Sequence, residues 1–445
     1  MGNLREDTIC GIATALGEGG IGIVRISGSE ALSVAERVVR LRSRQSLASL
    51  QSHRLHLADV VLPGKGCDRY GGKAESALHE SEIIDEALVV CMRAPSSYTA
   101  EDIVEIHSHG GTIVLGLVSE ACVLSGARLA EPGEFSQRAF LNGRIDLSQA
   151  EAVLDTIRAK SEAGLRLAQR HLRGELGREV SGLRACLLAL LSQIEAGIDF
   201  SEEDISFVEK DVLCRSLDET IEKIDHMLRT ADRGIRLRDG ARVVIAGPPN
   251  VGKSSVLNAL LGQERAIVTD IPGTTRDVIE ESLVWGGLRM TLVDTAGVRD
   301  TDDVVEREGI KRTRSAVDEA DVVVEVADAS MIANAGGWRP VSSTGRVPEI
   351  LVLNKSDLVD EECIVRLIER IGSSTESAVI ATSVRTGVGL ERLRQRIEAC
   401  LLGGILEPVD DVVVMNLRHR DALARAQAGL VRGLEAVRNG AALEL

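Results

Sequence analysis

The stretch that decides the fold runs Gly247-Pro248-Pro249-Asn250-Val251-Gly252-Lys253-Ser254 and fits the pattern G-x-x-x-x-G-K-[ST]. It follows the apolar run 243–246 and leads into 255–260, which is typical of a helix. In a phosphate-binding loop, glycines let backbone N–H groups approach the phosphates. Lys253 would place a cation on the outer phosphates, and the Ser254 hydroxyl can bind Mg²⁺. We therefore predict that the chain binds a nucleoside triphosphate.

A second motif selects the base. Asn354-Lys355-Ser356-Asp357 follows the apolar run 350–353 and matches the Asn-Lys-x-Asp element of guanine-nucleotide binders. The Asp357 carboxylate can accept hydrogen bonds from guanine N1–H and the exocyclic amine, whereas adenine offers no matching pair of donors. The sequence thus favours GTP over ATP.

Two further motifs lie between these. Gly273-Thr274-Thr275-Arg276-Asp277 is a switch-type loop whose Thr275 hydroxyl suits Mg²⁺. Asp294-Thr295-Ala296-Gly297 follows the strand-like run 290–293. We expect Asp294 to hold the metal through water and the Gly297 N–H to sense the γ-phosphate.

The residue after this last motif bears on mechanism. Val298 stands where Ras-like enzymes place the glutamine that orients the attacking water. Another group must therefore position water and neutralise the charge that develops on the phosphoryl group, and the sequence assigns no arginine finger. A bound monovalent cation is the alternative, with the carbonyl oxygen of Asn250 as a suitable ligand.

Composition limits the remaining possibilities. With 445 residues and 44% hydrophobic content, the chain has room for two to four packed domains. We find no signal sequence and no apolar span of 18 residues, and so expect a cytoplasmic protein without a membrane segment. The net charge of -16 disfavours nonspecific nucleic-acid binding through a broad positive surface.

Several local features have weaker functional interpretations. His107 and His109 could bind a metal, but polar turn residues are the better interpretation without a third ligand. The cysteines lack C-x-x-C spacing, which indicates reduced packing residues. Any RNA contact must use local arginine clusters, each of which is more simply a solvated helix face or linker. The clusters are Arg37, Arg40, Arg42 and Arg44; Arg229, Arg233, Arg236 and Arg238; and Arg418, Arg420, Arg425 and Arg432.

The order of patterns along the chain indicates an inserted domain. The first 140 residues alternate strand-like runs with helices, such as a helix over 30–41, and predict an α+β domain. Apolar residues at helical spacing over 148–198 and 218–229 predict long helices, and 417–437 is helical again. This last segment is too short to fold alone. It is expected to pack on the earlier helices, so that the nucleotide domain interrupts a helical domain.

Taken together, these motifs resemble one family over nearly the whole chain: the tRNA uridine-modification GTPases called MnmE or TrmE. Besides the GTPase motifs, the resemblance rests on Gly22-Ile23-Val24-Arg25-Ile26-Ser27-Gly28, on the long block Pro132-Gly133-Glu134-Phe135-Ser136-Gln137-Arg138-Ala139-Phe140-Leu141-Asn142-Gly143-Arg144-Ile145-Asp146-Leu147, and on Ile198-Asp199-Phe200.

The resemblance implies a multidomain α/β protein with an N-terminal α+β folate-binding-like domain, a helical domain and an inserted Ras-like, doubly wound P-loop GTPase domain. We expect a folate-binding and dimerisation domain over 1–142 and the first helical part over 143–239. The GTPase domain would span 240–402, and the second helical part 403–445.

The function that the resemblance implies is installation of the carboxymethylaminomethyl group at C5 of the tRNA wobble uridine. The family uses GTP, Mg²⁺, K⁺ and a tetrahydrofolate one-carbon donor, and the sequence leaves open the 5-formyl or the methylene form. The implied partners are a second copy of the chain, an FAD-dependent MnmG (GidA)-type protein, in a heterotetramer, and tRNA; no membrane is involved.

The site residues that the resemblance implies include Glu306, which matches the family's water-positioning carboxylate. Folate contacts would come from Arg25, Glu105 and Arg144, because arginine can meet the glutamate tail and a carboxylate can accept from pterin N–H groups. Mg²⁺ ligands would be Ser254 and Thr275. K⁺ ligands would be Asn250, Thr269, Ile271 and Thr274. The nucleotide contacts would be Asn250, Val251, Gly252, Lys253, Ser254, Ser255, Thr269, Asp270, Ile271, Pro272, Gly273, Thr274, Thr275, Asp294, Thr295, Ala296, Gly297, Asn354, Lys355, Ser356 and Asp357.

One feature departs from the family. Its members end in a further helix and a Cys-x-Gly-Lys tail, a motif that does not occur in this sequence. Because the sequence stops soon after the Asn439-Gly440 helix cap, we expect a truncation rather than a variant ending. Two other functions stay open at this point. One is a ribosome-assembly GTPase, which should carry a basic RNA-binding module. The other is a folate-dependent one-carbon transferase with a GTP switch, which would need no flavoprotein.

Overall fold

The computed structural model describes residues 7–63, 82–199, 210–262, 279–285, 288–294, 317–335, 349–373, 377–402, 414 and 416–439. The chain forms two compact units, Met1–Val153 and Leu154–Leu445. Several predicted site residues lie outside the described residues, and they are Thr269, Asp270, Ile271, Pro272, Gly273, Thr274, Thr275, Thr295, Ala296, Gly297 and Glu306.

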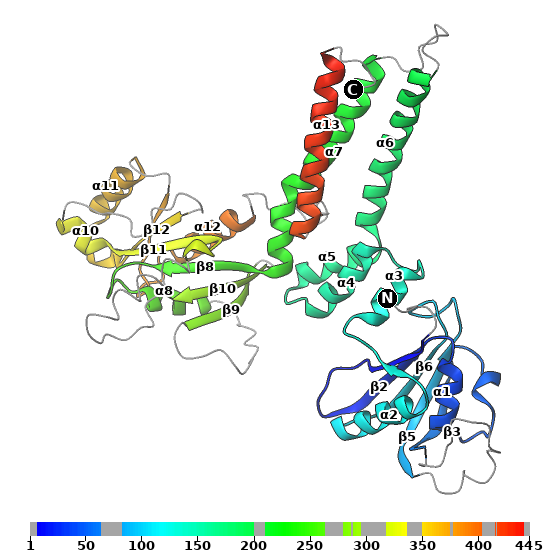
Figure 1. Cartoon of the computed structure of the whole chain (residues 1–445). Coiled ribbons are helices and arrows are strands. Elements are labelled where there is room, and N and C mark those ends of the chain that lie inside the picture. The colour runs from blue at the N-terminus through cyan, green and yellow to red at the C-terminus, as the bar shows by residue number, and fades with distance from the viewer. Residues whose placement is uncertain are drawn as a thin grey trace, which may run out of the picture. The chain divides into compact units, whose positions relative to one another are not determined.

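The first unit is built on a seven-stranded sheet in the order β3-β4-β5-β6-β2-β1-β7 (Figure 1). Its strands are β1 (Ile9–Ile12), β2 (Gly19–Ser27), β3 (Val39–Leu41), β4 (Leu55–Val61), β5 (Ile83–Met92), β6 (Ile103–Gly110) and β7 (Arg128–Leu129). Its helices are α1 (Ala31–Val38), α2 (Thr112–Leu124), α3 (Glu134–Leu141) and the start of α4 (Leu147–Arg158), with a short 3-10 helix at Leu47–Ser49. Neighbouring strands are antiparallel except for the parallel pair β1 and β7.

Alternation along the strands decides which face of this sheet is covered. Val24 and Ile26 of β2 join Val104 and Ile106 of β6 in one buried cluster with α1 and α2. The intervening residues point to the opposite face, since successive strand side chains alternate. Two glycines allow close packing in this unit. A Cβ on Gly22 would lie 2.7 Å from Leu115 of α2, and a Cβ on Gly110 of β6 would lie 2.7 Å from the Gly19 carbonyl oxygen of the neighbouring β2.

The second unit begins with helices. They are α5 (Glu162–Leu172), α6 (Glu175–Asp199), α7 (Lys210–Asp239) and, from the end of the chain, α13 (Leu417–Arg438). Helices α7 and α13 lie side by side (Figure 1). Contacts between them include Arg420 Nη1 with Asp232 at 2.9 Å and Arg438 Nη2 with Asp218 at 2.6 Å. The final segment therefore packs on an earlier helix, as the sequence predicts.

A six-stranded sheet in the order β13-β12-β11-β8-β10-β9 lies between α7 and α13 in the sequence. Its strands are β8 (Ala241–Ala246), β9 (Ile279–Trp285), β10 (Leu288–Asp294), β11 (Val322–Asp328), β12 (Glu349–Asn354) and β13 (Ala378–Ala381). Its helices are α8 (Lys253–Leu261), α10 (Ala329–Ala335), α11 (Glu361–Gly372) and α12 (Leu390–Leu402), with a 3-10 turn at Ser356–Leu358.

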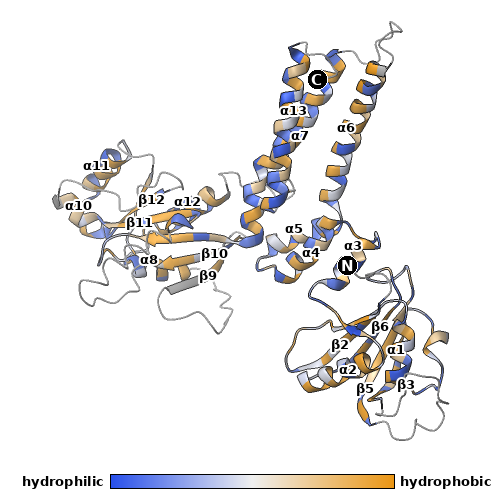
Figure 2. Ribbon diagram, viewed as in Figure 1, coloured by the Kyte–Doolittle hydropathy of each residue, from blue (hydrophilic) through white to orange (hydrophobic). Residues whose placement is uncertain are grey.

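This second sheet is parallel apart from β9, which pairs antiparallel with β10. Its central strands are strongly hydrophobic (Figure 2), and every residue of β11 is buried. Strands that are apolar on both faces are typical of parallel sheets covered by helices. The fold prediction is confirmed: an α+β N-terminal domain, a helical domain and a doubly wound domain of GTPase type.

Helix α6 corrects one expectation. Its segment Glu175–Ile198 is long and apolar enough to cross a membrane by length and composition, with a mean hydropathy of 1.2, although the sequence analysis found no such span. Only 11% of the 18-residue stretch that meets this criterion is buried in the structure. Its contacts run to α5 and α7. By length and composition alone, one such helix is weak support for a membrane segment.

Candidate functional site

The predicted phosphate loop connects β8 to α8. Gly252 lies just before the helix with φ +97°, and Gly247 has φ +141°. A Cβ on Gly247 would lie 2.2 Å from the Val326 carbonyl oxygen, and one on Gly252 would lie 2.4 Å from Asn354 Nδ2. Both glycines are thus required by the backbone conformation and by close packing. The loop ends at the N-terminus of α8, where backbone N–H groups and the helix dipole favour an anion.

Lys253 lies inside this loop. The residue is only 7% exposed, and its Nζ donates to the carbonyl oxygens of Gly247 at 3.0 Å and Pro248 at 2.8 Å. These acceptors hold the ammonium group within the curve of the loop. Phosphate oxygens are stronger acceptors for this ammonium group than neutral carbonyl oxygens, because the opposite charges add Coulomb attraction to the hydrogen bond.

The predicted guanine turn is tied to the phosphate loop through two side chains. Asn354, at the end of β12, is buried and donates from Nδ2 to the Val251 carbonyl oxygen at 2.9 Å. Lys355 has φ +61° and donates from Nζ to the Asn250 carbonyl oxygen at 3.0 Å. The two motifs are separated by about a hundred residues in the sequence, yet they form one connected structure, which we call the nucleotide site (residues 247–254 and 354–357).

Two residues that were not predicted contact the nucleotide site. Ser383 is buried and donates from Oγ to Asp357 Oδ1 at 2.7 Å, which orients the carboxylate predicted to bind guanine. Asp328, the last residue of β11, lies 2.7 Å from Lys355 Nζ. Both follow apolar strand segments, and that position at the carboxyl end of a parallel strand could have identified them.

The remaining predicted nucleotide contacts are only partly described. Ser254 and Ser255 occupy the first turn of α8. Asp294 is the last residue of β10 and pairs in register with Ile245 of β8, so its backbone lies close to the start of the phosphate loop. The switch residues and Glu306 lie outside the described residues.

A second group of predicted residues meets in the first unit. Arg25 of β2 and Glu105 of β6 are direct cross-strand partners, and Arg25 Nη2 lies 2.7 Å from Glu105 Oε1. Arg25 also stacks on the Tyr98 ring, 5.1 Å from its centroid, and Arg144 stacks on the same ring at 5.2 Å. Arg25 and Arg144 therefore share one aromatic ring, and Glu105 joins them through its ion pair with Arg25.

Two aromatic residues of this group were not predicted. Phe135 lies 5.5 Å from the Arg25 guanidinium, and the Tyr98 hydroxyl shares a hydrogen bond of 2.8 Å with Ser136 Oγ. Arg144 is held by a further hydrogen bond from Nη1 to the Tyr98 carbonyl oxygen, at 2.9 Å. We call Arg25, Tyr98, Glu105, Phe135 and Arg144 the Tyr98 cluster. Aromatic residues make up only 2% of the chain, which is a signal that could have directed attention to Tyr98 and Phe135.

His107 and His109 lie in the strand β6 and not in a turn as expected, and no group of three or more potential metal ligands occurs in the described part of the chain. His107 Nε2 lies 3.2 Å from Glu105, and His109 Nδ1 lies 2.8 Å from Asp85. Burial raises the pKa of Asp85, but hydrogen bonds and charge from His109 outweigh it and lower the pKa overall. The seven described cysteines are free, and burial raises the pKa of the Cys91 thiol to about 11.

Many arginines of the predicted RNA clusters pair with acids of this chain. Five of the twelve form ion pairs: Arg42 with Asp59 and Glu86, Arg229 with Asp225, Arg236 with Asp321, Arg238 with Asp155, and Arg420 with Asp232. The charge of these five is compensated within the chain, which favours the interpretation of solvated helix faces.

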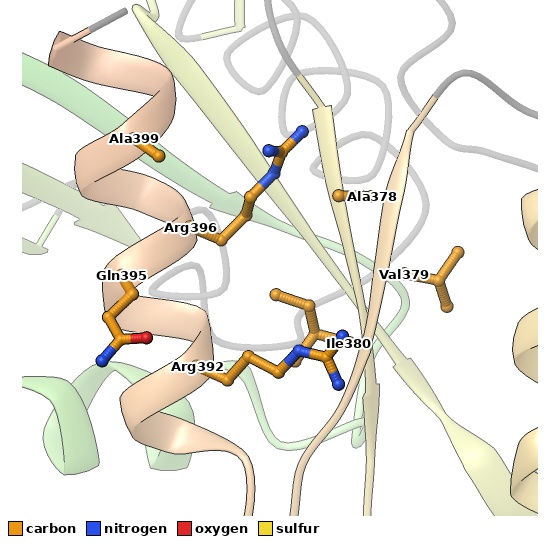
Figure 3. Close-up of a pocket in the computed structure, with 7 residues that line it drawn as sticks. All are labelled: Ala378, Val379, Ile380, Arg392, Gln395, Arg396 and Ala399. Atoms are coloured by element: carbon orange, nitrogen blue, oxygen red, sulfur yellow. The ribbon is translucent and has the colours of Figure 1, made fainter. Parts of the chain in front are cut away.

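A groove of about 370 Å³ lies apart from both groups, between β13 and α12 (Figure 3). Arg392 and Arg396 extend from α12 toward β13, which is the end strand of its sheet. None of the predicted site residues lines this groove, and its lining residues are Ala378, Val379, Ile380, Arg392, Gln395, Arg396 and Ala399.

The fold and the nucleotide site define a P-loop protein of the GTPase class, carrying an additional helical domain and an α+β domain. Family models match both additional parts. The MnmE helical domain matches residues 147–445, and the N-terminus of GTP-binding protein TrmE matches residues 8–144. The chain belongs to the MnmE family of tRNA modification GTPases.

Relatives named tRNA modification GTPase MnmE match nearly the whole chain. The protein of Acetivibrio thermocellus is 39% identical over 99% of this chain and 92% of its own length. The protein of Carboxydothermus hydrogenoformans is 42% identical over the same two shares. That of Heliobacterium modesticaldum is 43% identical over 98% of this chain and 91% of its own length. Among solved structures, the G domain of the T. maritima FeoB iron transporter aligns with 36% of this chain and 98% of that one, at 27% identity and a TM-score of 0.25.

Proposed function

We propose that this protein is a potassium-stimulated GTPase of tRNA modification. With an FAD-dependent MnmG-type partner, it would install the carboxymethylaminomethyl group at C5 of the wobble uridine, using a tetrahydrofolate one-carbon donor. The observation that carries the GTPase part is the connection between the two nucleotide motifs, in which Asn354 and Lys355 donate to the carbonyl oxygens of Val251 and Asn250. The family membership supports tRNA as the substrate.

The domain division is part of this proposal. A folate-binding domain would span 1–142, a helical domain 143–239 and 403–445, and the GTPase domain 240–402. The pairing of α7 with α13 on either side of the second sheet in the sequence supports an insertion.

GTP and Mg²⁺ fit the residues present. The cradle formed by Gly247 and Gly252 leaves no room for a Cβ, and Lys253 supplies the cation for the phosphates. Ser254 in the first turn of α8 and Thr275 would supply oxygen ligands, which Mg²⁺ prefers. Bound Mg²⁺ would neutralise charge on the outer phosphates.

Potassium would bind beside the phosphate loop, through Asn250 together with Thr269, Ile271 and Thr274. The structure refines one element of this proposal. The Asn250 carbonyl oxygen accepts a hydrogen bond from the Lys355 ammonium group at 3.0 Å, and a second cation on that oxygen would meet repulsion. The side-chain amide oxygen of Asn250, an exposed residue, is therefore the better ligand.

The cation proposal is tested by measuring GTP hydrolysis in KCl and in NaCl at equal ionic strength. We expect faster hydrolysis in KCl, and a loss of that difference in Asn250→Ala at saturating GTP. Equal rates of the unmodified protein in the two salts would contradict potassium stimulation. GTP affinity measured in both salts separates an effect on turnover from an effect on binding.

Glu306 is proposed to position the attacking water. We expect Glu306→Ala to keep its GTP affinity and to lose turnover by about a hundredfold, the size typical of a lost general-base or positioning group. An unchanged kcat would remove this assignment.

The Tyr98 cluster is proposed as the folate site. Its guanidinium groups could bind the carboxylates of the glutamate tail, Glu105 could accept from pterin N–H groups, and Tyr98 and Phe135 offer flat apolar surfaces to the ring. A titration of the full chain with labelled 5-formyl-tetrahydrofolate tests this proposal, with Arg144→Ala expected to weaken binding. Failure of the unmodified protein to bind would contradict the folate part of this proposal.

A homodimer through the first unit is proposed on the open face of its sheet. Leu55, Leu57 and Leu88 are 53%, 42% and 40% exposed there. Cross-strand register places Leu55, Val90, Glu105 and Arg25 in one row, so the apolar face continues into the Tyr98 cluster. We expect Leu57→Asp to weaken dimerisation in sedimentation experiments. A dimer of unchanged stability would contradict the use of this face. A heterotetramer with the flavoprotein and a cytoplasmic location complete the proposal.

A further inference from the structure

Asp328, which no motif in the sequence includes, connects the guanine turn to the end of β11. It is the last residue of β11, and its side chain is 7% exposed. One carboxylate oxygen, Oδ2, accepts from Lys355 Nζ at 2.7 Å. The other, Oδ1, accepts from the backbone N–H of Ser330 at 2.9 Å and from its hydroxyl at 2.6 Å. The carboxylate is therefore fixed at both oxygens.

This carboxylate stays ionised in the fold. Burial raises the pKa of Asp328, but the hydrogen bonds from Lys355 and Ser330 and the charge of Lys355 outweigh burial and hold the pKa below its usual value. An ionised carboxylate that is nearly buried needs a cationic or hydrogen-bonding partner. Lys355 meets that need at one oxygen and Ser330 at the other.

Lys355 is the residue on which this pair acts. Its Nζ contacts both Asp328 and the Asn250 carbonyl oxygen, so that one ammonium group joins the end of β11, the guanine turn and the phosphate loop. Its side chain is 36% exposed. A partly exposed lysine stem normally keeps much rotamer freedom, and ordering it on ligand binding would cost side-chain entropy.

We propose that Asp328 is a positioning residue for guanine nucleotides, acting through Lys355. By fixing the lysine against the phosphate loop independently of the ligand, it sets the relative position of the base-binding turn and the phosphate-binding loop. A nucleotide that binds the turn and the loop together then finds them already correctly placed. Because Lys355 is ordered before the nucleotide binds, its ordering does not lower the affinity. This inference rests on the proposed guanine-nucleotide site.

A double-mutant cycle tests the proposal, with the affinity for a fluorescent GDP measured for Asp328→Ala, Lys355→Ala and the double variant. We expect each single variant to raise the Kd by about tenfold, the size of a coupling between a charged pair and its ligand. The double variant should bind within about twofold of Lys355→Ala alone, because Asp328 acts only through that lysine. The loss in Asp328→Ala should appear in the KM for GTP more than in kcat, because the residue acts on nucleotide binding through Lys355.

A matched control is Asp155→Ala, which removes a carboxylate of similar exposure, 11%, that is paired with Arg238 at 2.8 Å in the same unit. This change should lower thermal stability and leave the Kd for GDP within about twofold. Asp328→Asn keeps the shape and the Ser330 contacts but removes the charge, and should raise the Kd by at least about threefold. It also serves as the reporting variant if the alanine form does not fold.

Two outcomes would overturn the role of Asp328. One is an unchanged Kd in a folded Asp328→Ala or Asp328→Asn protein. The other is a double variant whose loss equals the product of the two single losses, which would show that Asp328 acts by a route other than Lys355. A separate result, unchanged GDP binding in Lys355→Ala, would contradict the proposed guanine site itself and with it this inference.

Discussion

The Tyr98 cluster and the nucleotide site differ in what holds their functional groups. In the Tyr98 cluster, side chains hold one another: Arg25 pairs with Glu105, and two guanidinium groups stack on one ring. In the nucleotide site, Lys253, Asn354 and Lys355 all donate to backbone carbonyl oxygens. A site held by side chains should lose ligand affinity when one ring or charge is removed. In a site held by the backbone, affinity should depend most on the few side chains that contact the ligand.

The largest effect is expected for Lys253→Ala. The loop around this residue is shaped by glycines and backbone contacts, so the fold should survive while the cation for the phosphates is lost. We expect the Kd for GTP to rise by about a thousandfold, corresponding to two charge-assisted hydrogen bonds. Isothermal titration measures this change. Lys210→Ala is the control, because Lys210 is exposed and donates to the Arg438 carbonyl oxygen at 3.0 Å, and an equal loss there would show a nonspecific effect.

The next effect concerns the stability of the first unit. Glu134 is 2% exposed and contacts Arg128 at 2.7 Å and Arg138 at 3.0 Å. Burial raises the pKa of Glu134, but hydrogen bonds from Arg128, the backbone of Glu131 and Arg138 lower it to about 2 from its usual value of 4.5. A carboxylate with a lowered pKa stabilises the fold above the unfolded value and loses that contribution as the pH falls through the folded value.

Glu134→Gln should therefore lower the free energy of unfolding by about 3 kcal/mol at pH 7. The difference between the two proteins should shrink as the pH falls below about 4.5 and vanish near pH 2. Both tyrosines precede residue 154 and both tryptophans follow it, so tyrosine and tryptophan emission report on the two units separately. A constant difference across this pH range would show that charge is not the cause.

The Tyr98 ring gives the third effect. Tyr98→Leu keeps an apolar side chain but removes the surface on which Arg25 and Arg144 stack, each contact contributing about 1 kcal/mol. We expect binding of 5-formyl-tetrahydrofolate to weaken by about tenfold. Tyr98→Phe keeps the ring and loses only the hydrogen bond to Ser136, so it should bind within about twofold of the unmodified protein. Equal losses in both variants would assign the effect to the hydroxyl instead.

The sequence predicts most of the nucleotide site because its motifs are local. Short spacings fix the conformation of the phosphate loop, and β8, β10 and β12 all occur where apolar runs place them. Ser383 and Asp328 escaped prediction because each is a common residue at a strand end, and only tertiary contacts bring them to Asp357 and Lys355. Of the Tyr98 cluster, only Arg25, Glu105 and Arg144 were predicted, and only through family resemblance, since its members lie far apart in the sequence.

The boundaries of helices and strands are also hard to predict where they depend on tertiary contacts. The helix expected over 30–41 ends at Val38, because Val39 is extended and pairs with Val60 of β4. The segment 148–198, expected to form long helices, contains the three helices α4, α5 and α6. They are separated near Ser161, which caps α5, and near Gly174, which has φ +78°. Apolar spacing alone does not locate such breaks, since strand pairing and capping depend on neighbours in space.

The smallest effect tests whether a side chain that contacts the nucleotide site can be removed with little loss of GDP affinity. Ser383→Ala deletes the hydroxyl that donates to Asp357 Oδ1 at 2.7 Å, while the carboxylate keeps its place at the end of the guanine turn. One lost hydrogen bond to a carboxylate should raise the Kd for GDP by about fivefold, or about 1 kcal/mol. Ser373→Ala is the matched control, since Ser373 is exposed and donates to the Arg370 carbonyl oxygen at 3.0 Å. A loss as large as that of Lys253→Ala would mean that side chains, and not the backbone, hold the nucleotide site together, and the contrast with the Tyr98 cluster would disappear.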